Sequence, residues 1–505
     1  MSRIRRVLIA NRGEIAVRVI RTLRELDITS IAVFSEPDRA SLHVLLADEA
    51  YPIGPGPAAE SYLNLERVLE TARQTKADAI HPGYGFFAES APFARACEEA
   101  GIVFIGPRSD IIASLGDKLA AREAARRAGV PLVPGSEAPL ETLEELRAAA
   151  RKLGYPLMLK AAAGGGGKGM RRVARESELE AAWTLTRGEA QAAFGDARVY
   201  AERAIARPRH VEAQIVADAY GRVAFLGERE CSIQRRHQKL LEESPSPAFD
   251  AALRARFAEA ACRIAKQVGY LSAGTVEFIL EDGEFYFLEV NTRLQVEHPV
   301  TEMTTGIDLV AEQIRIAEGA PLSFGDTPPA PRGWSIEARI LAEDPAAGFM
   351  PSVGRIERVR FPQGPGVRND AGIYRGFEVP VYYDSLLAKL VVWALDRESA
   401  RRRLLRALHE FVLEGVNHNL AFHRWLLAHP EFVAGNLSTR FLDEHFDPAA
   451  LQPGREASEI ALFAAALHER EERMRIAVPE PNGAQTRSSW KWPERPRSSG
   501  ARVRR

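Results

Sequence analysis

Cysteine is scarce in this sequence, with Cys97, Cys231 and Cys262 the only three among 505 residues and none in paired spacing. That scarcity excludes a disulfide framework and a structural zinc site, and it is typical of a reducing compartment. Long apolar runs are also absent, and Val7–Ala10 is too short for a signal peptide. We therefore expect a cytoplasmic protein that does not enter a membrane.

An excess of one charge is missing as well. The 67 Lys and Arg residues face 68 Asp and Glu residues, for a formal net charge of −1. A chain so balanced has no overall attraction for nucleic acid or for an anionic membrane, and we expect neither as a partner. The length suggests about three domains, enough for a cleft between lobes.

Strand and helix patterns alternate through the first ~115 residues, as in a doubly wound parallel sheet. The pattern predicts a helix over Glu14–Leu26 and short strands at Val7–Ala10, Ile31–Phe34, Ala79–Ile80 and Val103–Ile105. The stretch His81–Gly85 directly follows a strand, where α/β sheets place ligands. A plain Gly/Pro turn is an equally good interpretation.

A glycine run, Gly164–Gly169, lies between two segments that predict strands, Tyr155–Lys160 and Met170–Val173. A P-loop is excluded because Ala162 stands where its first glycine is needed, and glycine follows Lys168. A dinucleotide fingerprint is met only formally, since a strand and not a helix comes next. A flap that closes over phosphates and a plain linker remain open.

Two glutamate-bearing strands, Thr275–Leu280 and Phe285–Val290, form a predicted hairpin. A two-residue loop would place Glu277 and Glu289 on opposite faces, whereas a three-residue loop with left-handed Gly283 places them on one face. We expect the three-residue loop, with the carboxylates as diagonal neighbours roughly 7–8 Å apart at the backbone. Two carboxylates so close repel unless a cation lies between them.

The stretch Glu289–Pro299 alternates polar and apolar residues. If it is extended, one face carries Glu289, Asn291, Arg293, Gln295 and Glu297. An ordinary strand with a solvated side is the alternative. The amide oxygen of Asn291 would complete an oxygen-only ligand set suited to Mg²⁺ with nucleotide phosphates.

The basic run Arg235–Lys239 is either solvated charge or an anion site. Further along, Trp334–Ile340 alternates so that Glu337 and Arg339 turn away from the apolar side chains, and a mostly antiparallel region extends to about Phe446. A helix is possible over residues 456–475. Residues 482–505 hold seven basic and one acidic residue without an apolar pattern, and we expect them to be disordered.

Over about residues 3–446 these motifs resemble biotin carboxylase, an ATP-grasp ligase. The resemblance rests on Ile9–Ala16, His81–Gly85, Gly116–Lys118, Gly164–Arg171, Arg209–Glu212, Gln234–Lys239 and Glu289–Glu302. It implies an α/β fold with an α+β C-terminal part: a doubly wound parallel N-terminal sheet, a mobile glycine-rich lid and a mostly antiparallel C-terminal domain. The expected division is into five parts: 1–115 (N-terminal α/β domain), 116–135 (linker helix), 136–203 (lid), 204–446 (the C-terminal part of the ATP-grasp fold together with the C-terminal domain of the family) and 447–505 (helical segment and basic tail).

The resemblance also implies roles by matching position. ATP would be bound by Lys118, Lys160, Gly165, Gly166, Gly167, Glu202, Ile205, His210, His237, Glu277 and Glu289. Mg²⁺ or Mn²⁺ would be bound by Glu277, Glu289 and Asn291. Bicarbonate would be framed by Lys239, Arg293, Gln295 and Val296, with Glu297 as its base and Arg339 facing biotin; the catalytic set is Glu297, Arg339, Arg293 and Lys239.

Two positions depart from the family pattern. Arg203 stands where a lysine is usual beside the adenine, and Trp334-Ser335 replaces the common His-Ala. Both departures concern the surroundings of the site more than the proposed chemistry.

The function implied is the ATP- and bicarbonate-dependent carboxylation of biotin through carboxyphosphate, the first half-reaction of an acyl-CoA carboxylase. No methionine is followed by lysine, so we expect biotin on a separate carrier protein or domain, a separate carboxyltransferase subunit, and a homodimer or larger complex. The layout after Gly372 leans toward the propionyl- and methylcrotonyl-type subunits. Alternatives are another ATP-grasp ligase, a nucleotide-binding protein without turnover and, least favoured, a nicotinamide dehydrogenase.

Overall fold

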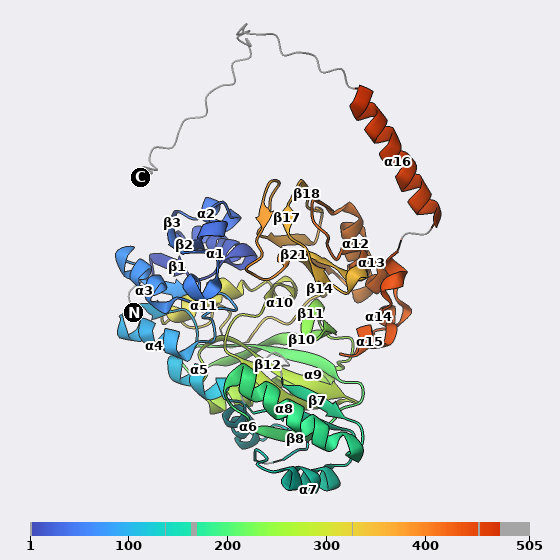
Figure 1. The fold of residues 1–505 in the computed structure, drawn as a ribbon. Helices are drawn as coiled ribbons and strands as arrows, with labels where there is room; N and C mark the ends of the chain where they lie inside the picture. The colour runs from blue at the N-terminus through green and yellow to red at the C-terminus, as the bar shows by residue number, and fades with distance from the viewer. Residues whose placement is uncertain (1–2, 137, 163–168, 326, 453–454, 475–505) are drawn as a thin grey trace. The chain divides into compact units, whose positions relative to one another are not determined.

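In the computed structural model, which describes residues 3–136, 138–162, 169–325, 327–452 and 455–474, the first five strands form a parallel sheet (Figure 1). Its order is β3-β2-β1-β4-β5. The strands are β1 Arg6–Ile9, β2 Thr29–Ser35, β3 Glu49–Gly54, β4 Ala79–His81 and β5 Val103–Phe104; the helices are α1 Gly13–Glu25, α2 Leu42–Leu46, α3 Leu65–Gln74, α4 Ala91–Glu99 and α5 Ser109–Gly116. This confirms the predicted doubly wound layer.

The crevice where such a sheet usually binds ligands is filled by the chain itself. Strand order reverses between β1 and β4, and ligands ordinarily bind outside the carboxyl ends of the strands at that point. Here Gly372 lies against the start of α1, so close that a Cβ on it would be 2.8 Å from the Glu14 nitrogen. Asn11 Nδ2 also bridges the crevice, donating to the carbonyls of Pro82 and Tyr84 at 2.7 Å each. A dinucleotide pyrophosphate therefore has no room at this helix.

A small subdomain follows α6 (Lys118–Arg127). It holds α7 Leu143–Leu153, β6 Leu157–Ala161, β7 Met170–Val173, α8 Leu179–Phe194 and β8 Val199–Arg203, with strand order β7-β6-β8. β6 and β7 are antiparallel, as the flap interpretation requires. The glycine run between them, including Gly165, Gly166 and Gly167, lies outside the described residues.

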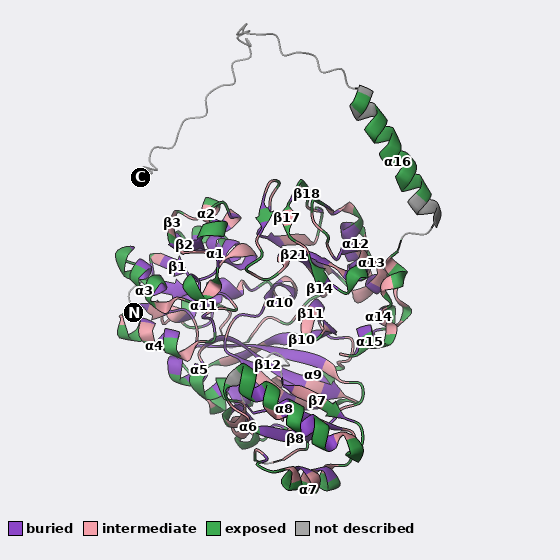
Figure 2. Ribbon diagram, viewed as in Figure 1, coloured by how far each residue is buried: buried purple, intermediate pink, exposed green. Residues whose placement is uncertain are grey.

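The largest sheet has eight strands in the order β13-β12-β9-β10-β11-β14-β21-β19. Its strands are β9 Arg209–Ala217, β10 Val223–Arg235, β11 Gln238–Ser244, β12 Ser272–Glu281, β13 Glu284–Asn291, β14 Trp334–Leu341, β19 Val367–Ala371 and β21 Leu386–Ala394. The pairings among them are antiparallel. Figure 2 shows β10 and β12 buried, whereas the outer side of α8 is exposed.

Helices and short strand pairs complete this part of the chain. The helices are α9 Ala251–Gln267, α10 His298–Thr305, α11 Leu309–Ala317, α12 Arg397–Glu410, α13 Leu420–Ala428, α14 Pro430–Val433 and α15 Phe441–His445. The strand pairs are β15 Glu343–Asp344 with β16 Met350–Pro351, β17 Gly354–Arg355 with β20 Glu378–Val379, and β18 Arg358–Arg360 with β22 Val412–Glu414. The predicted antiparallel C-terminal region is therefore confirmed, with helices added.

The hairpin of β12 and β13 corrects the predicted register. Glu281 pairs with Glu284 across a two-residue turn, in which Asp282 and Gly283 have φ of 50° and 77°. The expected three-residue loop is therefore wrong. A bulge between the Glu277 and Phe278 pairs shifts the register by one residue, and Glu277 comes to lie directly opposite Glu289. The carboxylates share a face, but as direct partners and not as diagonal neighbours.

The expectation of one extended stretch over Glu289–Pro299 is also wrong. β13 ends at Asn291, and residues 292–297 form an irregular connection to α10. Glu297 is the residue before the first turn of this helix, with φ −82° and ψ 11°, and Pro299 stands in that turn. Proline is favoured there because the first helical N–H groups have no partner within the helix.

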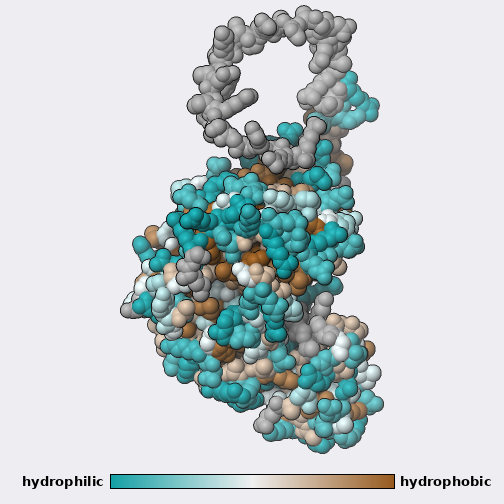
Figure 3. All heavy atoms as spheres, turned by 90° about the vertical axis from the view of Figure 1, so that its left-hand side faces the viewer, coloured by the Kyte–Doolittle hydropathy of each residue, from teal (hydrophilic) through white to brown (hydrophobic). Residues whose placement is uncertain are grey.

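The chain divides into two units, Met1–Leu451 and Gln452–Arg505. In the second unit, α16 spans Arg455–Met474, close to the predicted helix; the tail that we expected to be disordered lies outside the described residues. The face drawn in Figure 3 is mostly hydrophilic, with hydrophobic residues in small groups. None of the helices in the described part of the chain has the length and apolar character of a membrane crossing.

Candidate functional site

Glu277 lies at the centre of a buried polar cluster on the long sheet. One of its oxygens accepts from Asn291 Nδ2 at 2.8 Å, Gln295 Nε2 at 2.9 Å and Lys239 Nζ at 3.1 Å. The other oxygen lies 2.8 Å from His210 Nε2. Three segments that are distant in sequence, β9, β11 and the β12–β13 hairpin with its exit, thus converge on one carboxylate.

Glu277 and Glu289 have opposite pKa shifts. Burial alone would raise the pKa of Glu277, but Lys239 and His210 hold it well below its usual range. For Glu289, burial first and then the charge of Glu277 raise the pKa, against the ammonium of Lys118. A divalent cation between the two carboxylates would remove this repulsion, and hard oxygen ligands suit Mg²⁺ or Mn²⁺. The pair therefore fits a metal site.

Glu297 is fully buried between two cations. Its Oε1 accepts from Lys239 Nζ at 2.8 Å and its Oε2 from Arg339 Nη2 at 2.9 Å. Against the effect of burial, Lys239 and Arg339 hold the pKa of Glu297 well below its usual range. The carboxylate is therefore ionised, and its basicity depends on where these two cations point.

Arg339 and Arg293 are each fixed by a glutamate that the sequence analysis did not single out. Arg339 Nε donates to Glu242 at 2.6 Å. Arg293 Nε donates to Glu89 at 2.8 Å, and its Nη1 donates to Gln295 Oε1 at 2.9 Å. Glu89 stands four residues after the His81–Gly85 motif, so its only sequence signal was proximity to that motif.

Glu212 is a further carboxylate that sequence reasoning missed. It lies directly opposite Glu277 on β9, is fully buried, and pairs with Lys239 and with Arg229, whose Nε is 2.9 Å away. Burial first, and then the charge of Glu297, raise the pKa of Glu212 to about 7. The signal was available, because Glu212 stands two residues after His210 and so on the same strand face.

The residues predicted to bind nucleotide lie along the edge between the small subdomain and the sheet. Lys160 Nζ is 2.5 Å from Glu202, which also pairs with Arg122. Burial lowers the pKa of Lys118, with the charge of Glu289 opposing. The charges of Glu289 and Lys160 both act on the pKa of Lys118, so the two lysines lie near the carboxylate pair of Glu277 and Glu289.

Two other predicted nucleotide residues, His237 and Ile205, lie in connections between strands, and Arg203 is one of the two departures from the family pattern. His237 occupies the β10–β11 turn, and burial, followed by the charge of His210, lowers its pKa. Ile205 is partly buried in the connection between β8 and β9. Arg203 is exposed and lies 5.8 Å from the centre of the Tyr286 ring.

The basic run Arg235–Lys239 separates into two environments. Arg235 donates to the Gly348 carbonyl at 2.6 Å and lies over the Phe349 ring, whereas Lys239 enters the carboxylate cluster. Solvated charge therefore describes Arg236, which is exposed, and neither Arg235 nor Lys239.

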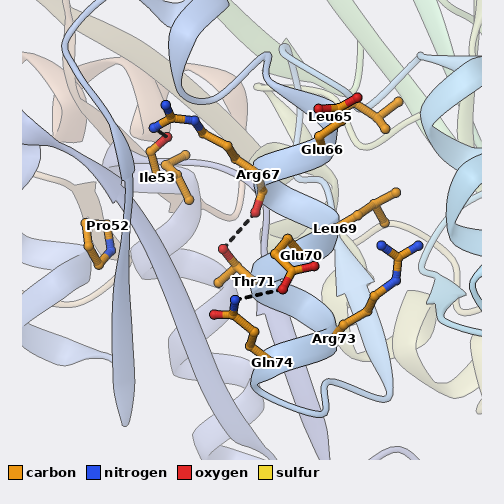
Figure 4. A pocket seen from close by; sticks show the side chains of 10 residues that line it. All are labelled: Pro52, Ile53, Leu65, Glu66, Arg67, Leu69, Glu70, Thr71, Arg73 and Gln74. Carbon is orange, nitrogen blue, oxygen red and sulfur yellow. Dashed lines mark hydrogen bonds between the residues drawn. The ribbon is translucent and has the colours of Figure 1, made fainter.

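A separate groove of about 740 Å³ lies beside α3 (Figure 4). Arg67 Nη1 donates to the Ile53 carbonyl at 3.2 Å, and Gln74 Nε2 donates to Glu70 at 2.7 Å. None of the candidate site residues lines it. The groove is not part of the cluster around Lys239.

Three families match consecutive parts of the chain. The biotin carboxylase N-terminal domain matches residues 3–112, the ATP binding domain of the carbamoyl-phosphate synthase L chain matches residues 117–324, and the biotin carboxylase C-terminal domain matches residues 337–444.

Individual proteins match at high identity. Biotin carboxylase 1 of Bacillus subtilis is 52% identical over 444 residues, which cover 88% of this chain and 99% of that protein. The propionyl-CoA carboxylase alpha chain of Ruegeria pomeroyi is 45% identical over 499 residues, covering 94% of this chain and 73% of that one. The solved biotin carboxylase domain of Hydrogenobacter thermophilus 2-oxoglutarate carboxylase, a dimer in complex with MgADP, ADP and bicarbonate, is 46% identical, with a TM-score of 0.86 and coverage of 90% and 100%.

Proposed function

The chain belongs to the biotin carboxylase family of ATP-grasp ligases, and on that basis we propose which of its residues carry the ATP- and bicarbonate-dependent carboxylation of biotin. The observation that carries the assignment is Glu297, held between Lys239 and Arg339 at 2.8 and 2.9 Å. A buried base flanked by two cations is suited to an anionic nucleophile and an anionic transition state.

ATP is bound at the edge between the small subdomain and the sheet. Lys118 and Lys160 contact its phosphates, and the residues at this edge, Glu202, Ile205, His210 and His237, surround the nucleotide. Glu277, Glu289 and Asn291 hold Mg²⁺ or Mn²⁺, which, when bound, neutralises charge that develops on the transferred phosphoryl group. The raised pKa of Glu289 supports this role, since it comes from burial first and then from the charge of Glu277, which a bound cation would offset.

Bicarbonate is bound by Lys239, Arg293, Gln295 and Val296. Arg293 is held by Glu89, and this fixes the direction from which the anion approaches the γ-phosphate. When Lys239 turns to the anion, it withdraws positive charge from Glu297, whose pKa then rises toward that of an effective base. Glu297 takes the bicarbonate proton, the bicarbonate oxygen attacks the γ-phosphorus, and ADP leaves.

The carboxyphosphate formed breaks down to CO₂ and phosphate. Phosphate takes the proton of the biotin ureido nitrogen, and Arg339 stabilises the resulting enolate-like oxygen while the nitrogen attacks CO₂. Glu242 orients Arg339 for this role through the bond of 2.6 Å. Exclusion of water protects carboxyphosphate from hydrolysis, which is the task we propose for the glycine run of the lid.

We further propose a separate biotin carrier and a separate carboxyltransferase as partners, in a homodimer or larger assembly. The relatives support an assembly of more than one chain, since one is the alpha chain of a propionyl-CoA carboxylase and another was solved as a dimer. The five-part division into 1–115, 116–135, 136–203, 204–446 and 447–505 is proposed likewise. The acceptor is chosen by the carboxyltransferase, and the sequence after Gly372 favours the propionyl or methylcrotonyl type.

The function is tested by ADP release from the purified chain with ATP, Mg²⁺ and bicarbonate. We expect release that rises with added free biotin. Release with an amine but not with biotin would indicate another ATP-grasp ligase, and nucleotide binding with no release would indicate a protein without turnover. The Gly372 backbone at the start of α1 argues against a dinucleotide enzyme.

A further inference from the structure

Lys389 is a fully buried cation that the proposed mechanism does not use. It lies on β21, and its Nζ donates to the Val296 carbonyl at 2.8 Å. Glu14 Oε2 is 3.4 Å from the same nitrogen, and the centre of the Tyr84 ring is 5.6 Å away. The ammonium therefore faces a bicarbonate-site residue from one side and the N-terminal layer from the other.

The strand register places Lys389 in a row of charged residues. It is directly opposite Arg339 on β14 and directly opposite Asp370 on β19, so the three side chains share one face of the sheet. α10, which begins at His298, packs against β14 and β21. Lys389 thus lies beneath the turn that leads into α10, next to the biotin-facing arginine.

Stability alone does not account for this lysine. A buried ammonium loses its hydration, and its pairing recovers that cost only when the geometry is favourable; apolar residues of similar size are often as stable. The paired carboxylate here is at 3.4 Å, and neither oxygen of the Glu14 carboxylate has a hydrogen-bond partner among the described residues. The shortest contact of Lys389 is instead with a backbone carbonyl.

That carbonyl belongs to a turn which is fixed at two successive residues. His298 Nδ1 lies 2.8 Å from the Gln295 carbonyl, and because a carbonyl only accepts, Nδ1 carries the proton and donates it. Lys389 then fixes the next carbonyl, that of Val296. With both carbonyls held, the peptide planes that carry Gln295, Val296 and Glu297 have one orientation.

We propose that Lys389 is a positioning residue for bicarbonate, acting through the Val296 carbonyl on the turn that presents Gln295, Val296 and Glu297. The inference rests on the proposed function and deepens it. Loss of the donor leaves the carbonyl unsatisfied and lets the turn rotate, so that bicarbonate meets a disordered site while the nucleotide site, on other strands, is unchanged.

The test compares Lys389→Met with Arg397→Met. Arg397 is a matched control, because its guanidinium is also largely buried, donating to Glu243 at 2.8 Å and to the Phe432 carbonyl at 2.9 Å, away from the Val296 turn. Lys389→Gln is the second variant, since it keeps an N–H donor of reduced reach. Each is assayed as ADP release against bicarbonate concentration, together with MgADP affinity and thermal stability.

We expect the KM for bicarbonate of Lys389→Met to rise by roughly 10–100-fold, the worth of a hydrogen bond from a charged donor, with MgADP affinity unchanged. The KM for bicarbonate of Lys389→Gln should lie between those of Lys389→Met and the wild type. If Lys389→Met does not fold, Lys389→Gln takes its place in the comparison. A KM that matches the wild type, or that rises no further than in Arg397→Met, would overturn the proposal. A wild type without biotin-dependent ADP release would instead refute the proposed function itself.

Discussion

At the scale of single residues, the site is a set of buried charges that balance one another. Lys239 contacts Glu212, Glu277 and Glu297 at once, and each carboxylate has a different second partner. Such a cluster is costly unless every member is paired. Its arrangement leaves Lys239 able to exchange a protein carboxylate for a substrate anion without losing charge balance.

Replacing Glu297 with Gln keeps the size of the side chain but removes the base, and the new NH2 group cannot accept from either Lys239 or Arg339. We expect turnover to fall by roughly 10²–10⁴, the usual worth of a positioned general base, with little change in nucleotide or metal affinity. ADP release that depends on bicarbonate and biotin measures this. Recovery of activity with extra Mg²⁺ would show that Glu297 is a metal ligand and not the base.

Glu289→Gln should behave differently, because it removes a metal ligand. We expect weaker Mg-nucleotide binding and a higher Mg²⁺ requirement along with slower turnover. A Mg²⁺ titration run in parallel on the two variants separates these roles. A Mg²⁺ requirement equal to that of the wild type would contradict the assignment of Glu289.

Glu14 makes stability depend on pH. Burial raises its pKa from 4.5 to about 7, against the charge of Lys389, so the folded chain binds this proton more tightly than the unfolded chain. Its contribution to stability is therefore full below about pH 4.5 and is lost as the pH rises toward 7. The free energy of unfolding of Glu14→Gln, relative to that of the wild type, should therefore rise by up to about 3 kcal/mol between pH 5 and pH 8.

Denaturant unfolding of both proteins at the two pH values checks this prediction. A difference between variant and wild type that is the same at pH 5 and pH 8 would show that Glu14 is ionised with an ordinary pKa when folded.

The sequence predicted many of the side chains that meet at this scale, but not their partners. Lys239, Arg293 and Arg339 stand in recognisable motifs. Glu89 and Glu242 fix two of these cations from other parts of the chain, across 204 and 97 residues. Pairings between residues so far apart in sequence depend on how the layers pack, and a local sequence pattern does not predict that packing.

At the scale of elements, the register of the β12–β13 hairpin differs from the one that the sequence pattern predicted. The two glutamates share a face, as we expected, but through a two-residue turn and a bulge. A bulge inserts one unpaired residue and has no clear signature in sequence. The end of β13 at Asn291 was missed for a related reason, because alternation continues through residues 293–297 without strand pairing.

The turn itself is testable through Gly283, whose φ of 77° is unfavourable for other residues. We expect Gly283→Ala to lower the free energy of unfolding by about 1 kcal/mol and, by straining the turn that sets Glu277 opposite Glu289, to raise the Mg²⁺ requirement. Gly221→Ala is the matched control, with φ of 82° and open space around it in the β9–β10 turn.

Denaturant unfolding and the Mg²⁺ titration together measure the effect of Gly283→Ala. If both glycine variants lose the same stability but only Gly283→Ala changes the Mg²⁺ requirement, the hairpin register links the turn to the metal site. Identical Mg²⁺ requirements in the two glycine variants would contradict it.

At the scale of the whole molecule, the order of parts was predictable because each part has its own periodicity. Parallel strand-helix units, a glycine run between strands and a later antiparallel region all appear in the predicted order. The contact of Gly372 with the start of α1 was not predictable, since it joins segments 358 residues apart in number and depends on both folds. That contact leaves no room for a dinucleotide at the start of α1, and the site that we propose lies on the eight-stranded sheet.

In the mechanism that we propose, the molecule activates bicarbonate with ATP before biotin is carboxylated. The most direct test is turnover with ¹⁸O-labelled bicarbonate, followed by mass analysis of the phosphate released. We expect one labelled oxygen in each phosphate, because the bicarbonate oxygen that attacks the γ-phosphorus stays on phosphorus when carboxyphosphate breaks down. Phosphate that carries no label while biotin is carboxylated would contradict it.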